Sequence, residues 1–164
     1  MKKFVAFSFF LLFSCNNINQ DCNNYYLIRH AEKVRVDPEN KDPELNEAGQ
    51  KRAVAWQEYF ANLEIGKIFS TNYNRTLQTV LPFSRSSELE INIYSPSSIN
   101  YEDFLETTSG DNVLIVGHSN TIPSFVNGLI QEEIYPDIED SNNSNLYIVS
   151  KCGAEINHEL IKIE

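Results

Sequence analysis

Short apolar runs alternate with segments of helical periodicity along most of this chain. Val113-Leu114-Ile115-Val116 is the clearest of these runs, and comparable segments lie at 25–28, 65–70 and 91–94. Apolar runs of this length are typical of buried strands. Helices are expected at residues 47–63, 73–83, 101–107 and 121–130. The alternation predicts an α/β fold, a three-layer α/β/α sandwich with a mainly parallel central sheet.

The predicted domain covers residues 25–164 and closes with two further strands, at 145–150 and 154–163. The first helix carries Trp56 and other apolar side chains at helical spacing, so one of its faces should pack on the sheet. The acidic segment 137–143 is expected to form an exposed loop. A chain of 164 residues has room for one such domain.

Two histidines follow two of the apolar runs. Arg29-His30 stands directly after the first run, and Gly117-His118 stands directly after the clearest one. In open α/β sheets, ligands bind at the carboxyl ends of the strands, so both histidines are expected in one pocket. Arg75 lies on the first turn of the helix that follows the run at 65–70, and we expect it near the same sheet edge.

These residue types suit phosphoryl transfer. An arginine is always charged and can bind phosphate oxygens through two parallel hydrogen bonds. A neutral imidazole is a nucleophile that can form a covalent intermediate. The N-terminus of a following helix adds backbone N–H donors for an anion. The strand ends therefore predict a site for a phosphorylated small molecule.

Four segments resemble motifs of the histidine phosphatase superfamily, which has the phosphoglycerate mutase-like fold. Residues 27–32 (LIRHAE) resemble its Arg-His-Gly signature, and residues 43–50 (PELNEAGQ) its Leu-Thr-x-x-Gly-x-x-Gln helix entry. Residues 70–79 (STNYNRTLQT) are similar to its Ser-x-x-x-x-Arg-x-x-Gln-Thr segment, and residues 116–119 (VGHS) to its second-histidine motif. The motifs occur in family order and cover most of residues 25–130.

The resemblance implies a role for each matching residue. His30 corresponds to the nucleophile that accepts the phosphoryl group, and Arg29, Arg75 and His118 correspond to the other residues of the phosphate pocket. The implied reaction transfers a phosphoryl group to His30 and then hydrolyses the phosphohistidine with water. It requires neither a metal nor another cofactor.

Two departures from the family pattern stand out. Ala31 replaces the usual glycine, which restricts the backbone angles at that position. The general acid has no convincing motif: Glu102 and Asp103 lie in the right part of the chain and Glu32 is a third candidate, but the sequence favours a solvated charge over a catalytic role for each of them. Short family members can lack an obvious acid, which favours substrates with good leaving groups.

Three functions agree with these residues. The leading hypothesis is an exported phosphatase that acts on a phosphomonoester or a related phosphorylated small molecule. The second is removal of phosphate from a protein phosphohistidine. The third is a lipoprotein that binds an anionic ligand without turning it over. Mutase activity is disfavoured because the chain is too short for an elaborated substrate-closing region.

The first 14 residues have the pattern of a secretory signal. Lys2 and Lys3 precede an apolar run from Phe4 to Phe13, which is too short to span a bilayer as a helix. The segment that ends in Cys15 resembles a bacterial lipobox, whose cysteine is lipidated, although ordinary cleavage stays open. Residues 15–24 have the composition of a tether. We therefore expect a lipoprotein on the periplasmic side of a bacterial cell envelope.

Export also affects how the charge and the cysteines are interpreted. The net charge is −10, and it becomes −12 once the two lysines of residues 1–14 are removed. Such a surface repels nucleic acid at long range. Cys22 and Cys152 could pair in an oxidising compartment or remain thiols. His158 has no partner motif and is expected to be structural or exposed.

Overall fold

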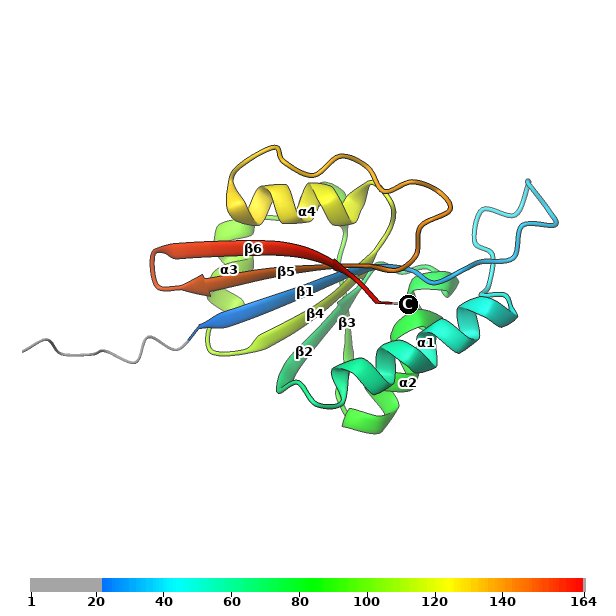
Figure 1. Cartoon of the computed structure of the whole chain (residues 1–164), viewed down its shortest axis with the longest axis horizontal. Helices are drawn as coiled ribbons and strands as arrows, with labels where there is room; N and C mark the ends of the chain where they lie inside the picture. Colours follow the sequence, from blue (N-terminus) through cyan, green and yellow to red (C-terminus); the bar gives the residue numbers. More distant parts are fainter. Residues whose placement is uncertain (1–21, 164) are drawn as a thin grey trace, which may run out of the picture.

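The computed structural model describes residues 22–163, which form one six-stranded sheet in the order β3-β2-β4-β1-β5-β6 (Figure 1). The strands are β1 (Asn23–Arg29), β2 (Ile65–Ser70), β3 (Ile91–Ile93), β4 (Asn112–Gly117), β5 (Asn145–Cys152) and β6 (Glu155–Lys162). Strands β3, β2, β4 and β1 are parallel, whereas β5 runs antiparallel to both β1 and β6. The predicted mainly parallel sheet is confirmed.

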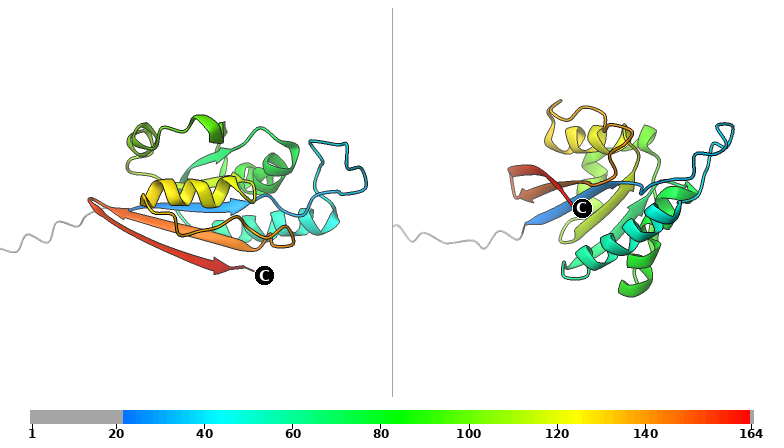
Figure 2. Two further views of the ribbon diagram at one scale, coloured as in Figure 1. Left: turned by 90° about the horizontal axis from the view of Figure 1, so that it is seen from above. Right: turned by 45° about the vertical axis from the view of Figure 1, so that its right-hand side comes forward.

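Helices cover both faces of the sheet, as predicted. They are α1 (Glu47–Phe60), α2 (Asn74–Ser87), α3 (Tyr101–Thr107) and α4 (Thr121–Ile130), with a short 3₁₀ turn η1 at Pro96–Ser98. Helices α1 and α2 lie on one face, and α3 and α4 lie on the other (Figure 2). The three layers of the α/β/α sandwich are therefore present.

Two helix boundaries differ from the sequence-based expectation. Helix α1 ends at Phe60, because Leu63 already donates its backbone N–H to Phe60 in a turn. Helix α2 continues to Ser87 and ends at Glu88, whose φ of 59° is left-handed. The serine-rich end of α2 has low helical propensity in isolation. The Ser87 hydroxyl bonds back to the Phe83 carbonyl at 2.8 Å and so supports the last turn.

Alternate residues of the strands enter two separate cores. In β1, Tyr25 and Leu27 pack towards α3 and α4, whereas Tyr26 and Ile28 pack towards α1 and α2. This two-sided burial explains why the strand reads as a continuous apolar run. Trp56 of α1 is 2% exposed and belongs to the second core, as its helical spacing predicted.

A disulfide joins the start of β1 to the end of β5, its antiparallel neighbour in the sheet. Cys22 is bonded to Cys152, 130 residues later in the chain, directly beside the paired residues Asn23 and Lys151. Of the two possibilities that the sequence left open, the structure therefore has the pairing. It connects the start of the domain to its closing strands.

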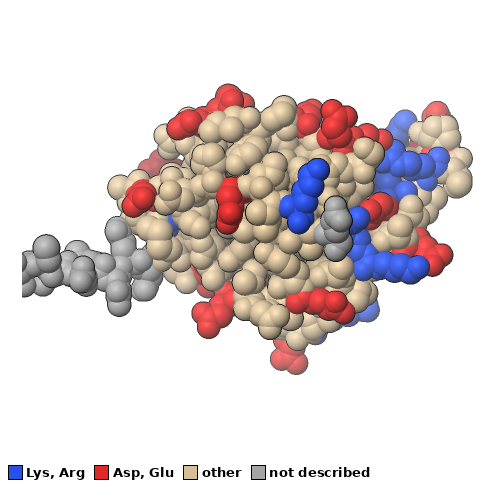
Figure 3. Space-filling view, viewed as in Figure 1, with Lys and Arg blue, Asp and Glu red and all other residues tan. Residues whose placement is uncertain are grey.

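The expected signal of residues 1–14, the lipidation site Cys15 and most of the tether lie outside the described residues. No helix within residues 22–163 has the length and apolar character needed to cross a bilayer. In Figure 3, basic side chains gather at one end of the molecule, over the loop after β1, while acidic side chains are spread over the rest of this face.

Candidate active site

The carboxyl ends of β1 and β4 bring the two histidines together. Arg29 pairs with Gly117 across the two strands, and His30 continues the ladder by donating its N–H to the Gly117 carbonyl at 2.9 Å. The His30 and His118 rings lie 5.6 Å apart between centroids. The adjacency follows from the sheet order, in which the first and fourth strands are neighbours.

His30 is held in one tautomer. Its Nδ1 lies 2.7 Å from the Ala31 carbonyl, which can only accept, so Nδ1 carries the proton. Nε2 therefore has a free lone pair when the ring is neutral. Burial lowers the pKa of His30 to about 3, and the charge of Arg29 lowers it in the same direction. The ring is 3% exposed and neutral at pH 7, as a nucleophile must be.

His118 has the opposite tautomer. Arg75 places Nη2, which can only donate, 3.4 Å from Nδ1 of the ring, so Nδ1 is unprotonated in the neutral form. Nε2–H then donates to the Thr71 hydroxyl at 2.9 Å, and the Thr71 hydroxyl in turn donates a hydrogen bond to the Thr76 hydroxyl at 3.0 Å. Burial and then the charge of Arg75 lower the pKa of His118 to about 4.

Arg75 is fixed from several sides but keeps one free donor. Its guanidinium lies over the Tyr73 ring, 4.4 Å from the centroid, and 3.6 Å from the Asp42 carboxylate. Nη1 donates to the Lys41 carbonyl at 3.3 Å. Its buried Nε has no hydrogen-bond partner among the described residues.

Arg29 is held by a segment that the sequence presented as an exposed loop. Its Nη1 donates to the backbone carbonyls of three residues of that segment, Glu139, Asp140 and Asn142, at 2.9–3.1 Å. Its Nη2 donates to the Asp140 carboxylate at 2.8 Å. Only its buried Nε lacks a partner among the described residues.

The prediction of an exposed loop at 137–143 is therefore wrong in part. Ile138 and Asn143 are buried, and the Asn143 side-chain amide donates to the His30 carbonyl at 2.8 Å. The Asp140 side chain is 71% exposed, yet it binds both Arg29 and Arg35. The composition of the segment indicated solvent, whereas its backbone carbonyls solvate a buried guanidinium that lies 110 residues away in sequence.

The three expected general acids do not reach the pocket. Glu32 forms an ion pair with Arg52 at 2.8 Å, on the side of α1. Glu102 and Asp103 lie on the first turn of α3, where their backbone N–H groups donate to the Asn100 cap. Asp140 does border the pocket, but hydrogen bonds from two arginines hold the pKa of its carboxyl far below the usual range. It is therefore an anion and no proton donor at pH 7.

Residues of the motif segments that do not line the pocket hold the lining residues in place through hydrogen bonds. The Thr79 hydroxyl accepts the Ala31 N–H at 2.8 Å and donates to the Arg75 carbonyl at 2.7 Å, which ties the segment after β1 to helix α2. Ala31 does not have a positive φ, so this position needs no glycine. Gln78 accepts the backbone N–H of Leu45 at 2.8 Å.

The pocket itself is an open cavity of about 420 Å³. Its lining includes the four residues expected from the sequence, Arg29, His30, Arg75 and His118. Lys33, Thr71, Tyr73 and Asp140 are additional lining residues that the sequence did not single out. Lys33 stands three positions after His30. This short distance from the Arg-His pair was the sequence feature that could have identified Lys33 as a pocket residue.

Two other expectations concern residues away from the pocket. His158 lies on exposed strand β6, where its Nδ1 is 2.8 Å from the Tyr135 hydroxyl, in agreement with a structural or exposed role. Within residues 22–163, no three His, Cys, Asp or Glu side chains come together in a way that could hold a metal ion.

Residues 25–95 match the sequence profile of the family described as Histidine phosphatase superfamily (branch 1). The sequence matches no curated protein. Solved structures with the same fold include a protein of Agrobacterium tumefaciens assigned as the phosphohistidine phosphatase SixA. It is 22% identical with a TM-score of 0.63, over 86% of this chain and 99% of that one.

Two further structures have lower sequence identity. The mycobacterial glucosyl-3-phosphoglycerate phosphatase is 13% identical with a TM-score of 0.62, over 87% of this chain and 98% of its own. An Escherichia coli protein assigned as an alpha-ribazole-5'-P phosphatase is 11% identical with a TM-score of 0.69, over 87% of this chain and 97% of its own. At these identities the likeness shows that the fold is shared.

Proposed function

We propose that the chain belongs to the histidine phosphatase superfamily, branch 1, whose profile matches residues 25–95, and that it hydrolyses a phosphomonoester through a phosphohistidine on His30. One observation carries the proposal. A neutral imidazole with a free Nε2 stands beside two arginines, and each arginine retains one buried, unpartnered N–H among the described residues. Those two donors, on Arg29 and Arg75, are the groups that an entering phosphate would satisfy.

In the first step, His30 Nε2 attacks phosphorus. An N–P bond forms, and the ester P–O bond breaks with its electron pair on the leaving oxygen. Arg29, Arg75 and Lys33 surround the reaction with positive charge that is already in place before the substrate arrives. The hydrogen bond from His30 Nδ1 to the Ala31 carbonyl stabilises the positive charge that develops on the ring.

His118 responds to the bound phosphate. An anion next to the ring favours its protonated form, so the pKa rises from about 4 once the phosphoryl group enters. The added proton goes to Nδ1 and breaks the hydrogen bond that Nδ1 accepts from Arg75 Nη2, so that Nδ1–H and Nη2–H both become donors for phosphoryl oxygens. In the second step, water attacks phosphorus, the N–P bond breaks, and inorganic phosphate leaves with His30 neutral again.

The test is phosphate release from a chromogenic aryl phosphate by the purified domain. Because the nucleophile has no substitute in the pocket, we expect His30→Ala to lower kcat by roughly a thousandfold or more. His158→Ala is the matched control, since that ring lies on β6, and its activity should stay at the wild-type level. Equal activity of the His30→Ala and wild-type proteins would remove His30 from the mechanism.

A phosphohistidine-bearing protein is a second candidate substrate. The structural likeness to an assigned phosphohistidine phosphatase supports it. A phosphohistidine peptide and aryl phosphate should be compared under the same conditions. A kcat/KM at least tenfold higher for the peptide would favour this reading over the small-molecule one. Binding of vanadate in calorimetry without turnover of any ester would instead indicate a non-catalytic anion-binding protein.

We also propose that the protein is exported and anchored through Cys15. The Cys22–Cys152 disulfide supports an oxidising compartment, where such bonds persist. In bacterial cells, the wild-type protein should fractionate with membranes, and Cys15→Ala should release it in soluble form. Recovery of wild-type protein in the cytosol, with free thiols at Cys22 and Cys152, would contradict export.

A further inference from the structure

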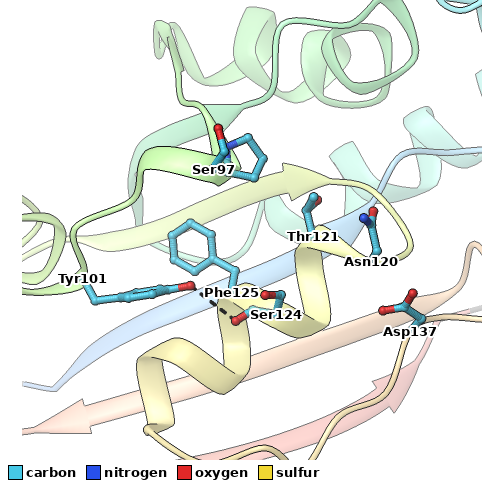
Figure 4. Close-up of a pocket in the computed structure, with 8 residues that line it drawn as sticks. Ser97, Tyr101, Asn120, Thr121, Ser124, Phe125 and Asp137 are labelled. Carbon is cyan, nitrogen blue, oxygen red and sulfur yellow. Dashed lines mark hydrogen bonds between the residues drawn. The ribbon is translucent and has the colours of Figure 1, made fainter.

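A second cavity continues from the phosphate pocket. It has a volume of about 490 Å³ and shares three lining residues with that pocket, Pro96, Asn120 and Thr121. Figure 4 shows the cavity between the turn η1 and the N-terminal half of α4. The two cavities share this wall, and we call the second one the leaving-group cavity.

The leaving-group cavity differs from the phosphate pocket in charge. The phosphate pocket contains Arg29, Lys33 and Arg75. Among the described residues, no lysine or arginine lines the leaving-group cavity, whereas the Asp137 carboxylate does. Asp137 is kept at the rim by its neighbour Ile138, whose N–H donates to the Ser119 carbonyl at 2.8 Å.

Its wall combines aromatic rings with polar groups. The rings of Tyr101 and Phe125 meet edge to face, 5.4 Å between centroids, and the Tyr101 hydroxyl donates to the Ser124 carbonyl at 3.3 Å. Burial and then the charge of Glu133 raise the pKa of Tyr101, although Glu133 itself does not line the cavity and accepts a hydrogen bond from Asn127. Aromatic faces and carboxylates together favour a cation and disfavour an anion.

The carboxyl groups in and near the phosphate pocket also favour a substrate that carries a cation. Asp140 borders that pocket as an anion bound to two arginines, and Glu32, Glu102 and Asp103 do not line it. None of these four carboxyl groups is therefore placed to protonate the leaving oxygen. A substrate that carries a proton donor next to its ester oxygen would supply what the site lacks.

We propose that the leaving-group cavity selects phosphomonoesters of amino alcohols, whose ammonium group faces Asp137. This specificity rests on the proposed phosphatase function. When His30 Nε2 attacks phosphorus, the P–O bond breaks and the leaving oxygen takes a proton from the substrate's own ammonium. The products of the step are phosphohistidine and a neutral amino alcohol, which regains a proton from solvent.

The experiment compares kcat/KM for three esters of similar size: O-phosphoethanolamine, glycerol 3-phosphate and 3-phosphoglycerate. The expected order is ammonium, then neutral, then carboxylate. Asp137→Asn should lower the ratio of O-phosphoethanolamine to 3-phosphoglycerate by about two- to fivefold, the range for a single exposed charge pair, and Asp137→Lys should lower it further. Glu106→Gln, an equal charge change on the exposed surface of α3, should keep the wild-type ratio.

The three esters also differ in intrinsic reactivity, which no substitution in the protein alters. A change in the kcat/KM ratio between variants therefore reports the contribution of the cavity alone. A wild-type preference for 3-phosphoglycerate, or the same ratio in Asp137→Asn as in Glu106→Gln, would overturn the proposed specificity while leaving the phosphatase intact. Failure to release phosphate from aryl phosphate as well would instead overturn the phosphatase function on which it rests.

Discussion

The two site histidines are neutral for the same reason and have opposite tautomers. A carbonyl that only accepts fixes the proton of His30 on Nδ1, and a guanidinium that only donates fixes that of His118 on Nε2. Neither assignment depends on solvent. The result is a pocket in which Nε2 of His30 is unprotonated, so the attack on phosphorus that we propose needs no prior removal of a proton from His30.

The lowered pKa values make the stability of the fold dependent on pH. In the unfolded chain a histidine takes up a proton near pH 6.5, whereas folded His30 and His118 do so only near pH 3 and 4. The folded pKa is the lower one, so the free energy of unfolding falls as pH falls from 6.5 towards 4. Each buried histidine contributes up to about 1.4 kcal/mol per pH unit, less for the partly exposed His118.

Urea unfolding at pH 7 and pH 5 measures this effect. His30→Asn should reduce the loss of stability between the two pH values, because the asparagine has no proton to take up. If the variant and the wild type lose the same free energy of unfolding between pH 7 and pH 5, His30 is not a buried histidine with a lowered pKa.

Asp140 predicts a second effect at the scale of one residue. Its carboxylate neutralises Arg29 and Arg35 at the mouth of the phosphate pocket, where it also repels an entering dianion. Asp140→Asn retains an acceptor oxygen and leaves the backbone carbonyls on Arg29 in place. We expect inorganic phosphate to bind about two- to fivefold more tightly, since the lost charge is exposed. Calorimetric titration against the wild type checks this, and weaker binding would show that Asp140 supports the site.

At the scale of elements, the N-terminal end of α1 is packed against the backbone of Glu32, two residues after His30. Asn46 caps the helix by accepting the Gly49 N–H at 2.9 Å, and its own N–H donates to the Glu32 carbonyl at 2.9 Å. A Cβ at Gly49 would lie 2.1 Å from that same carbonyl oxygen. The close approach of helix to backbone therefore requires a glycine at this position.

Gly49→Ala should force α1 away from Glu32. Overpacking of a fixed backbone contact costs about 1–3 kcal/mol, and we expect a loss of unfolding free energy of that size in urea titration. Lys51→Ala, on the exposed side of the same helix, should change the unfolding free energy by less than about 0.5 kcal/mol. Equal losses in the two variants would mean that α1 can shift away from the Glu32 carbonyl without a measurable loss of unfolding free energy.

At the scale of the whole molecule, the disulfide closes nearly the entire domain into one loop. The sequence separation of 130 between Cys22 and Cys152 restricts the unfolded chain strongly. Reduction should lower the free energy of unfolding by about 2–5 kcal/mol. The bond lies by the N-terminal end of β1, so kcat on aryl phosphate should be kept below the melting temperature.

Thermal unfolding with and without reductant checks the role of the disulfide. The double variant Cys22→Ser, Cys152→Ser should melt like the reduced wild type and should not respond to reductant. An unchanged melting temperature of the wild type after full reduction would show that the bond adds nothing to stability.

The sequence by itself determined the sheet, its alternation with helices and the convergence of four residues on one pocket. These features are local: apolar runs mark buried strands, Arg29 ends β1, His30 and His118 follow β1 and β4 directly, and Arg75 lies on the first turn of the helix after β2. Parallel strands end at one sheet edge, so residues after them converge whatever the loops do. The motif segments added the expected role of each residue.

Only the tertiary structure decided what surrounds these residues. The segment at 137–143 has the composition of a solvated loop, yet Arg29 is buried and needs acceptors, so the backbone of Glu139, Asp140 and Asn142 folds onto it. Likewise, the sequence left the pairing of Cys22 and Cys152 open until β1 and β5 lay side by side. Contacts between segments over 100 residues apart carry no local pattern, because they depend on the assembled sheet.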